Sequence, residues 1–302
     1  MTIFRHELRQ GRLSLIIWAA SIAFLFAVCI FLFPEMKGEM DQVSDVFSAM
    51  GNFSAAFGMD QVSFGTLTGF YAIECGNILG LGGALYAAMC GISMLSKEEK
   101  GHTAEFLLSH PISRNSILSG KLAALFLQIL VLNTAVLIIS LISIYAVGED
   151  IPWKEILLLH LAYVLLQIEI ASICFGISAF LRKGSLGVGL GLAIMLYFFN
   201  IIVNISDSAE FLKFISPYGY AEGTEIVTNI SLDGMLVLLG MLYGVIGVCA
   251  GYIQYNRKDV MQGKLFERKS SLFSSDKNVC RSWKLHQAAA GSVIIIVSSP
   301  SI

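Results

Sequence analysis

Six long apolar segments alternate with short polar segments along this chain of 302 residues. A helix needs about 20 apolar residues to cross a hydrocarbon core of about 30 Å, and each segment is close to or above that length. Strands of a β-barrel would instead give segments of about 10 residues with alternating polarity. The pattern therefore predicts an all-α polytopic membrane protein with six transmembrane helices, over about residues 13–33, 66–95, 122–147, 156–181, 186–205 and 235–255.

Composition supports this class and excludes others. The chain is 56% hydrophobic and only 14% charged, whereas soluble domains carry about 25% charged residues. A water-soluble globule of this size would need more polar residues to cover its surface. The 5 prolines and 28 glycines also give no low-complexity or collagen-like pattern. Water-soluble enzymes, disordered chains and fibrous proteins are therefore excluded.

Lysine and arginine gather on one side of the predicted spans. Residues 1–12 hold three, residues 97–121 four, the turn after the fourth span two, and the chain after Tyr255 eight, which makes seventeen. The other side holds only Lys37, Lys154 and Lys213. The positive-inside rule places the seventeen in the cytoplasm. We therefore expect a multi-pass protein of the cell membrane with both termini cytoplasmic.

The N-terminal segment, residues 1–12, mixes basic and apolar residues. Phe4 and Leu8 are four residues apart and share a helix face, which favours an elbow helix on the inner leaflet before the first span. The alternative is an unstructured basic leader. The apolar run that follows is longer than the core of a signal peptide, so we interpret it as a retained anchor ended by Pro34.

Two segments on the opposite side are less regular. Apolar residues at helical spacing predict a short helix within the segment 35–65. The segment 206–230 contains Phe211, Phe214, Ile215 and the string SPYGY, Ser216 to Tyr220. Its aromatic residues predict contact with the lipid headgroups.

The loop after the second span, residues 96–121, is the most informative stretch. Thr103 can cap a short helix that Pro111 ends, and Ser113 can cap the helix that follows. Phe106, Leu107 and Leu108 would form an apolar tip within charged surroundings. Such a knob suits docking into a groove of a soluble partner; the alternative is a plain loop.

Polar residues inside the spans give two further candidates. Glu74 and Asn77 lie one turn apart in the second span, and Glu169 lies in the middle of the fourth. Acidic groups in hydrocarbon are costly unless they are paired or hydrated, and they often mark a transport path. These three residues either line a substrate path or form hydrogen bonds between helices.

A stripe of glycines marks the sixth span. Gly240, Gly244, Gly247 and Gly251 recur at offsets of 0, 4, 7 and 11 and therefore share one face. Small residues in this arrangement allow another helix to approach closely. That helix belongs either to this chain or to a second copy of it.

Catalytic and metal-binding motifs are missing from the sequence. It has no GxxxxGK[ST] phosphate loop, no HExxH and no GxSxG. The six cysteines contain no CxxC pair, and five fall in predicted spans, where cysteine is a small packing residue. We therefore expect no catalytic residues, no ATP hydrolysis, no metal site and no disulfide framework. An intramembrane enzyme would need a paired catalytic set, which the spans lack.

One string resembles a known family. EEKGHTAEFLLSHPISR resembles the ABC-2 type transporter permeases, which carry an acidic pair, Gly-Thr and then x-E-x-L-L-x-x-P-x-S-R after the second span. It departs from that pattern in His102, between the glycine and the threonine. The basic start FRHELRQGR, the SPYGY string and a final YNRKD extend the likeness over about residues 3–260. The matching residues of the string are Glu98, Glu99, Gly101, Thr103, Glu105, Leu107, Leu108, Pro111, Ser113 and Arg114.

The resemblance implies the permease subunit of an ATP-driven exporter. Family members have six membrane helices, pair as homodimers or related heterodimers, and are driven by a separate ATP-binding subunit that carries ATP and magnesium. The loop after the second span is the coupling helix, which sits in a groove of that subunit. This implies a permease domain over 1–260, a cytoplasmic tail over 261–302, a bacterial cell membrane, no cofactor on this chain and no nucleic-acid partner. The alternative is a membrane anchor or sensor that transports nothing and recruits a cytoplasmic regulatory partner.

Overall fold

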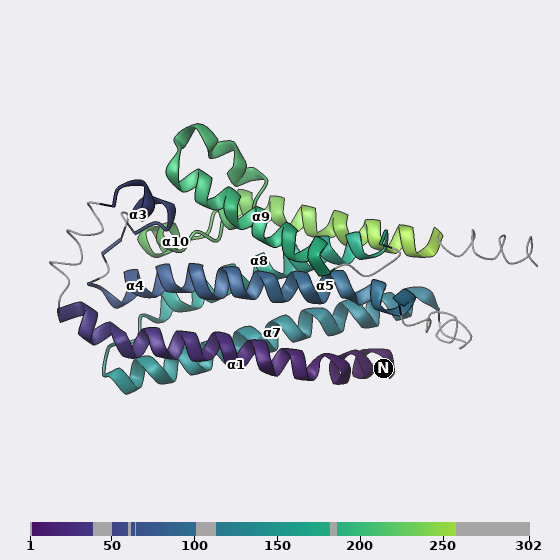
Figure 1. Ribbon diagram of the computed structural model, residues 1–302, viewed down its shortest axis with the longest axis horizontal. Helices are drawn as coiled ribbons and strands as arrows, with labels where there is room; N and C mark the ends of the chain where they lie inside the picture. The colour runs from purple at the N-terminus through teal and green to yellow at the C-terminus, as the bar shows by residue number, and fades with distance from the viewer. Residues whose placement is uncertain are drawn as a thin grey trace, which may run out of the picture. The chain divides into compact units, whose positions relative to one another are not determined.

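The computed structural model describes residues 2–38, 50–59, 62–63, 65–100, 113–181 and 186–257. Every regular element in this part of the chain is a helix, as the sequence predicts, and six helices are long and apolar enough to cross a membrane (Figure 1). The packing described below belongs to one compact unit, Met1–Tyr252; the stretch Ile253–Ile302 forms a second unit.

Three of the six spans follow the sequence pattern closely. Helix α8 covers Trp153–Ser178 and α9 covers Leu186–Ile205. The sixth span is the helix Gly234–Arg257. The apolar run of each of these spans therefore locates the ends of its helix within a few residues.

The second and third spans are longer than their apolar cores. The second consists of α4 (Leu67–Glu74), the π-helical segment η1 (Cys75–Leu81) and α5 (Gly82–Lys100). The third is α7 (Arg114–Val147), which ends at Gly148 in the left-handed conformation. Both α5 and α7 therefore extend beyond the predicted apolar stretch on the side of the loop between them.

The first span differs from the sequence expectation. Residues 2–12 are helical, but they form one continuous helix with the span, α1 (Thr2–Gly38), instead of a separate elbow. The helix continues through Gly11. Because Gly11 has no side chain, Gln128 of α7 occupies the space beside it. Pro34 does not end it either, since the helix continues beyond it to Gly38.

Helices α1 and α7 lie side by side along their length, and α5 packs against α8 and α9 (Figure 1). The core between them contains Tyr71, Tyr86, Tyr163 and Phe175, all almost fully buried. At Gly91 of α5 an added Cβ would lie 2.9 Å from the Cβ of Cys174, so the two helices are in close contact there. Large apolar side chains on α1 and the sixth span remain exposed, as expected of surfaces that face lipid.

Short helices cover the end of the bundle away from the α5–α7 loop. They are α3 (Asn52–Ala56), the 3₁₀-helices η2 (Asp207–Phe214) and η3 (Pro217–Gly219), and α10 (Gly223–Asn229). Of the short helix expected within 35–65, the described residues include α3; residues 39–49, which hold most of the apolar positions behind that expectation, lie outside the described part. Tyr218 and Tyr220 are buried instead of facing headgroups, because the Tyr218 hydroxyl donates to the Gly80 carbonyl at 3.1 Å and Tyr220 pairs with Glu169.

Candidate functional site

The candidate docking loop is held between the ends of two spanning helices. Helix α5 ends at Lys100, with Glu98 and Glu99 in its last turn, and α7 begins at Arg114. Ser113 is the N-cap of α7, as the sequence predicts: its side chain accepts a hydrogen bond from the Ser116 backbone nitrogen. The remaining residues of the predicted knob lie outside the described part of the chain: Gly101, Thr103, Glu105, Phe106, Leu107, Leu108 and Pro111.

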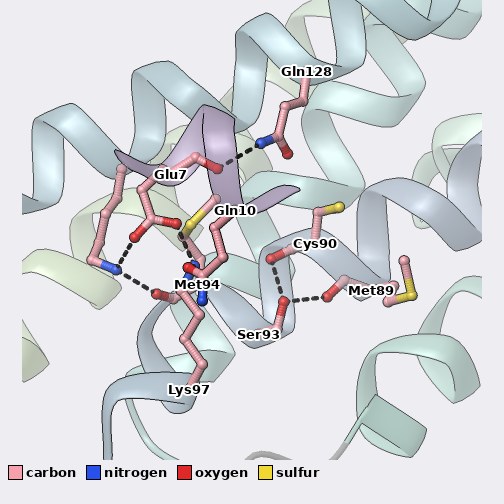
Figure 2. A network of polar contacts seen from close by, with 9 residues as sticks. Glu7, Gln10, Met89, Cys90, Ser93, Met94, Lys97 and Gln128 are labelled. Atoms are coloured by element: carbon pink, nitrogen blue, oxygen red, sulfur yellow. Dashed lines mark hydrogen bonds and ion pairs between the residues drawn. The ribbon is translucent and has the colours of Figure 1, made fainter. Parts of the chain in front are cut away.

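A cluster of charged and polar groups, here called the Glu7 cluster, lies near the ends of α5 and α7 that flank this loop. It consists of Glu7 and Gln10 of α1, Met94 and Lys97 of α5, and Lys121 of α7. The Glu7 carboxylate accepts from Lys121 Nζ at 2.8 Å through Oε1 and from Lys97 Nζ through Oε2. Figure 2 shows Glu7, Gln10 and Lys97 facing one another between the helices.

Two further hydrogen bonds complete the Glu7 cluster. Lys121 Nζ donates to the Met94 carbonyl at 3.0 Å, and Lys97 Nζ donates to Gln10 Oε1 at 2.9 Å. Gln128 Nε2 also donates to the Glu7 backbone carbonyl at 3.4 Å, which ties α7 to α1 a second time (Figure 2). The cluster therefore joins three helices at the end of the bundle that carries the loop, here called the loop end.

Burial makes the Glu7 cluster unusual. The side chains of Glu7 and Lys121 are 4% and 1% exposed, whereas that of Lys97 is 30% exposed. Charged side chains are almost never fully buried unless they are paired. One carboxylate thus compensates one buried ammonium group and one that still reaches water.

Sequence reasoning did not find this cluster. Lys97 and Lys121 counted only as topological charges, and Glu7 as part of a basic segment. The available signal was that Glu7 is the only acidic residue before Glu35. Its partners are 90 and 114 residues away along the chain, so no local pattern could identify them.

The three candidate path residues form hydrogen bonds with different partners. The thiol of Cys29, on α1, donates to Glu74 Oε2 at 3.6 Å, and the Tyr197 hydroxyl, on α9, donates to Asn77 Oδ1 at 3.0 Å. Glu169 of α8 is 4% exposed and accepts from the Tyr220 hydroxyl at 2.8 Å. Each residue therefore joins a different pair of elements.

Other intramembrane polar residues also bond between helices. Asn133 Nδ2 of α7 donates to Gln167 Oε1 of α8 at 2.7 Å, and both side chains are buried. The Tyr71 hydroxyl lies 2.7 Å from His160 Nε2 and 3.0 Å from Ser140 Oγ. Such pairs satisfy groups that would otherwise be costly to bury. They favour hydrogen bonding between helices as the role of these side chains.

The glycine stripe of the sixth span faces α8. An added Cβ would collide with Glu169 Oε2 at Gly240, and it would lie 3.6 Å from the Ser172 Cβ at Gly244 and 2.8 Å from the Ser172 carbonyl oxygen at Gly247. At Gly251 it would lie 3.2 Å from the Phe175 ring. Within this chain, then, α8 is the helix that approaches the stripe.

A small cavity lies at the opposite end of the bundle, which we call the far end. It measures about 30 Å³, and its lining includes Asn77, Tyr197, Asn200, Asn204 and Glu222. The partly buried Glu222 carboxylate accepts from Asn200 Nδ2 at 2.9 Å and from Asn204 Nδ2 at 3.4 Å. Burial raises the pKa of Glu222 above its ordinary value, against the opposing effect of these two hydrogen bonds. Sequence reasoning did not single out Glu222, because this residue lies outside the predicted spans, where acidic residues are common.

Comparison with known proteins agrees with the arrangement of spans and loop. Residues 1–260 match the family described as ABC-2 family transporter protein. No curated protein was found to match the chain. Because the family match covers most of the chain and includes all six spans, the chain belongs to the ABC-2 family of transporter proteins and is a membrane permease subunit of an ABC transporter.

Proposed function

We propose that this chain is the permease subunit of an exporter and that a separate ATP-binding subunit docks on the coupling loop, residues 98–114. Family membership supports an ATP-binding partner in general. ATP and magnesium would bind on that partner, and this chain would supply the membrane path and the helices that move. A second permease copy, identical or related, would complete the transporter. The charge distribution supports an orientation with the loop in the cytoplasm.

The observation that carries this proposal is the continuity of the helices on either side of the loop. Helix α7 has 34 residues, about 51 Å at 1.5 Å per residue, and begins at a capped N-terminus next to the loop. On the other side, α5 continues through η1 into α4, so the second span is also unbroken from the loop to the far end. A displacement of the loop would therefore move helices that cross the whole membrane.

The docking role can be tested by purification of the tagged full chain from its native membranes in mild detergent. With the wild type we expect a second protein to elute, identified by mass spectrometry as one with a GxxxxGK[ST] motif. The eluate should also hydrolyse ATP in the presence of magnesium. Glu105→Lys and Leu107→Asp should remove both, because they reverse a charge or place one on the apolar tip of the proposed knob.

Matched controls are available in the exposed η2 segment. Glu210→Lys makes the same change of charge and Phe211→Asp the same change of polarity, at residues outside the loop, and Phe211 is 62% exposed. Both should retain the ATP-binding protein. Its retention by both loop variants would contradict docking on the loop.

The anchor or sensor alternative makes a different prediction. In proteoliposomes that contain the assembled complex, a transporter's substrate should raise ATP hydrolysis and should accumulate on one side of the membrane. An anchor would change neither quantity for any compound in a panel of ions, peptides, lipids and drugs. Accumulation inside vesicles whose ATP-binding subunits face outward would establish export as the direction.

A further inference from the structure

We propose that Glu7 is a positioning residue for energy coupling: it holds the ends of α5 and α7 beside the coupling loop, so that α1 moves with them. This inference rests on the proposed function, since it assumes that an ATP-binding subunit acts on the loop. It adds a role for the N-terminal helix, which the proposed docking loop, residues 98–114, does not include.

The geometry of the carboxylate supports this role. Glu7 Oε1 is bonded to Lys121 of α7, and Glu7 Oε2 to Lys97 of α5. Lys97 lies three residues before the end of α5, and Lys121 lies seven residues after the start of α7. One carboxylate therefore bridges the two helices that enter and leave the loop, close to where each meets it.

The cluster also bonds α5 directly to α7. Lys121 Nζ donates to the Met94 carbonyl of α5 at 3.0 Å, so this ammonium group contacts all three helices. Charge-assisted hydrogen bonds are short and directional, and they are stronger in a poorly hydrated site than at the surface. Separation of α5 from the other two helices would break the Lys121–Met94 hydrogen bond and would remove Lys97 from Glu7.

Stability alone does not account for buried charges at this place. Replacement of a buried ion pair by apolar side chains of similar size is often neutral or stabilising. Apolar side chains, however, can slide past one another with small losses, whereas a bonded triad has one favourable arrangement. The ion pairs therefore favour movement of the three helix ends as one body.

The rest of α1 is placed to receive that movement. Gly11 allows Gln128 of α7 to pack against it, and the first turn of α1 lies beside Gly120 of α7. Further along the helix, Ile22 lies against Gly82 at the start of α5, and the Trp18 ring contacts the Tyr86 ring with centroids 6.1 Å apart. Helix α1 thus contacts both loop helices over several turns.

The test uses the complex of the full chain with its ATP-binding subunit and measures hydrogen–deuterium exchange with and without magnesium-ATP and vanadate. In the wild type we expect nucleotide trapping to change exchange in residues 2–12 by about fivefold or more, at the lower end of typical coupling between sites. The first turns of α7 should respond as well. No response in residues 2–12 of a trapped wild-type complex would overturn the proposal.

The informative variant is Glu7→Leu combined with Lys121→Met, which leaves neither buried charge alone. It should bind the ATP-binding subunit, hydrolyse ATP and show the α7 response, but the response of residues 2–12 should fall below about twofold. A purely structural role would not separate these readouts. Lys97→Met removes the direct bonds from α5 to Glu7 and Gln10, keeps the buried Glu7–Lys121 pair and should lower the same response in part.

A matched control lies at the far end, where Lys37 and Glu149 also join α1 to the chain that follows α7, at 2.7 Å but in contact with solvent. Lys37→Met with Glu149→Leu should leave the wild-type response unchanged. A wild-type response in both the Glu7/Lys121 variant and Lys97→Met would overturn the role of Glu7 while leaving docking intact. Absence of any ATP-binding subunit from the wild-type preparation would overturn the proposed function and this inference with it.

Discussion

The two ends of the α1–α7 pair carry the same chemistry in different surroundings. At the loop end, Glu7 pairs with Lys121 at 2.8 Å, and both side chains are almost fully buried. At the far end, Lys37 pairs with Glu149 at 2.7 Å, with side chains 48% and 27% exposed. Water and salt screen the outer pair but not the inner one. Nearly equal distances therefore give unequal energetic consequences, and burial decides which pair restrains the helices.

The largest effect is expected from Glu7→Ala. It leaves Lys121 buried without a counter-charge, which typically costs about 3–5 kcal/mol. The free energy of unfolding of the purified chain in detergent measures this loss. Glu35→Ala, an exposed change in the same helix, is the control and should stay within about 0.5 kcal/mol of the wild type. A loss below about 1 kcal/mol for Glu7→Ala would mean that water reaches the cluster.

Removal of both buried charges should cost much less than removal of one. Glu7→Leu with Lys121→Met is expected to unfold within about 1 kcal/mol of the wild type, because no buried charge is left alone. With Glu7→Leu alone and Lys121→Met alone it forms a double-mutant cycle. The same unfolding measurement then gives the interaction energy of Glu7 with Lys121. Additive single effects would contradict a direct Glu7–Lys121 interaction.

Glu222 adds a partly buried carboxylate at the far end and gives the comparison a pH dependence. Its pKa is raised above 4.5 in the folded chain, so the unfolded chain loses this proton first as the pH rises. Stability should therefore fall as the pH rises above about 4.5, until the folded pKa is passed. Glu222→Gln should weaken that fall, measured by thermal unfolding between about pH 5 and 8. Glu210→Gln, at an exposed position of η2, is the control and should keep the wild-type dependence of stability on pH. The wild-type dependence in Glu222→Gln as well would contradict the argument.

The smallest effect is expected at the exposed pair. Lys37→Met and Glu149→Leu, alone or together, should change the free energy of unfolding by less than about 1 kcal/mol. Lys37 also lies 5.7 Å from the centre of the Phe33 ring, a further weak and solvent-exposed contact. Added salt should reduce whatever difference remains. An effect as large as that of Glu7→Ala would remove the contrast between the two ends.

Much of the fold follows from the sequence because span length is a local property. The apolar run at 186–205 coincides with α9, and the run at 235–255 lies within the helix Gly234–Arg257. The glycine stripe likewise predicts one close-packed face from its spacing alone. Which helix occupies that face is not a local property, and only the structure shows that it is α8.

The details that the sequence did not reveal depend on distant partners. The continuity of α1 through residues 2–12 involves Gln128 of α7, which packs against Gly11 from 117 residues away along the chain. The π-helical turns at Cys75–Leu81 depend on a shift in hydrogen-bond register that hydropathy does not encode. The sequence leaves the role of Glu169 open between a substrate path and a hydrogen bond, and its partner Tyr220 lies 51 residues away, so no local pattern identifies it.

Lys97 and Lys121 have a consequence for how the chain is made. Both belong to a basic stretch that, by the positive-inside rule, would stay on one side of the membrane and orient the neighbouring spans before the helices pack. In the folded chain both are partners of Glu7, which is synthesised before either of them. Under that rule the same two ammonium groups would act first as topological signals during insertion and afterwards as the bonds that join the three helix ends.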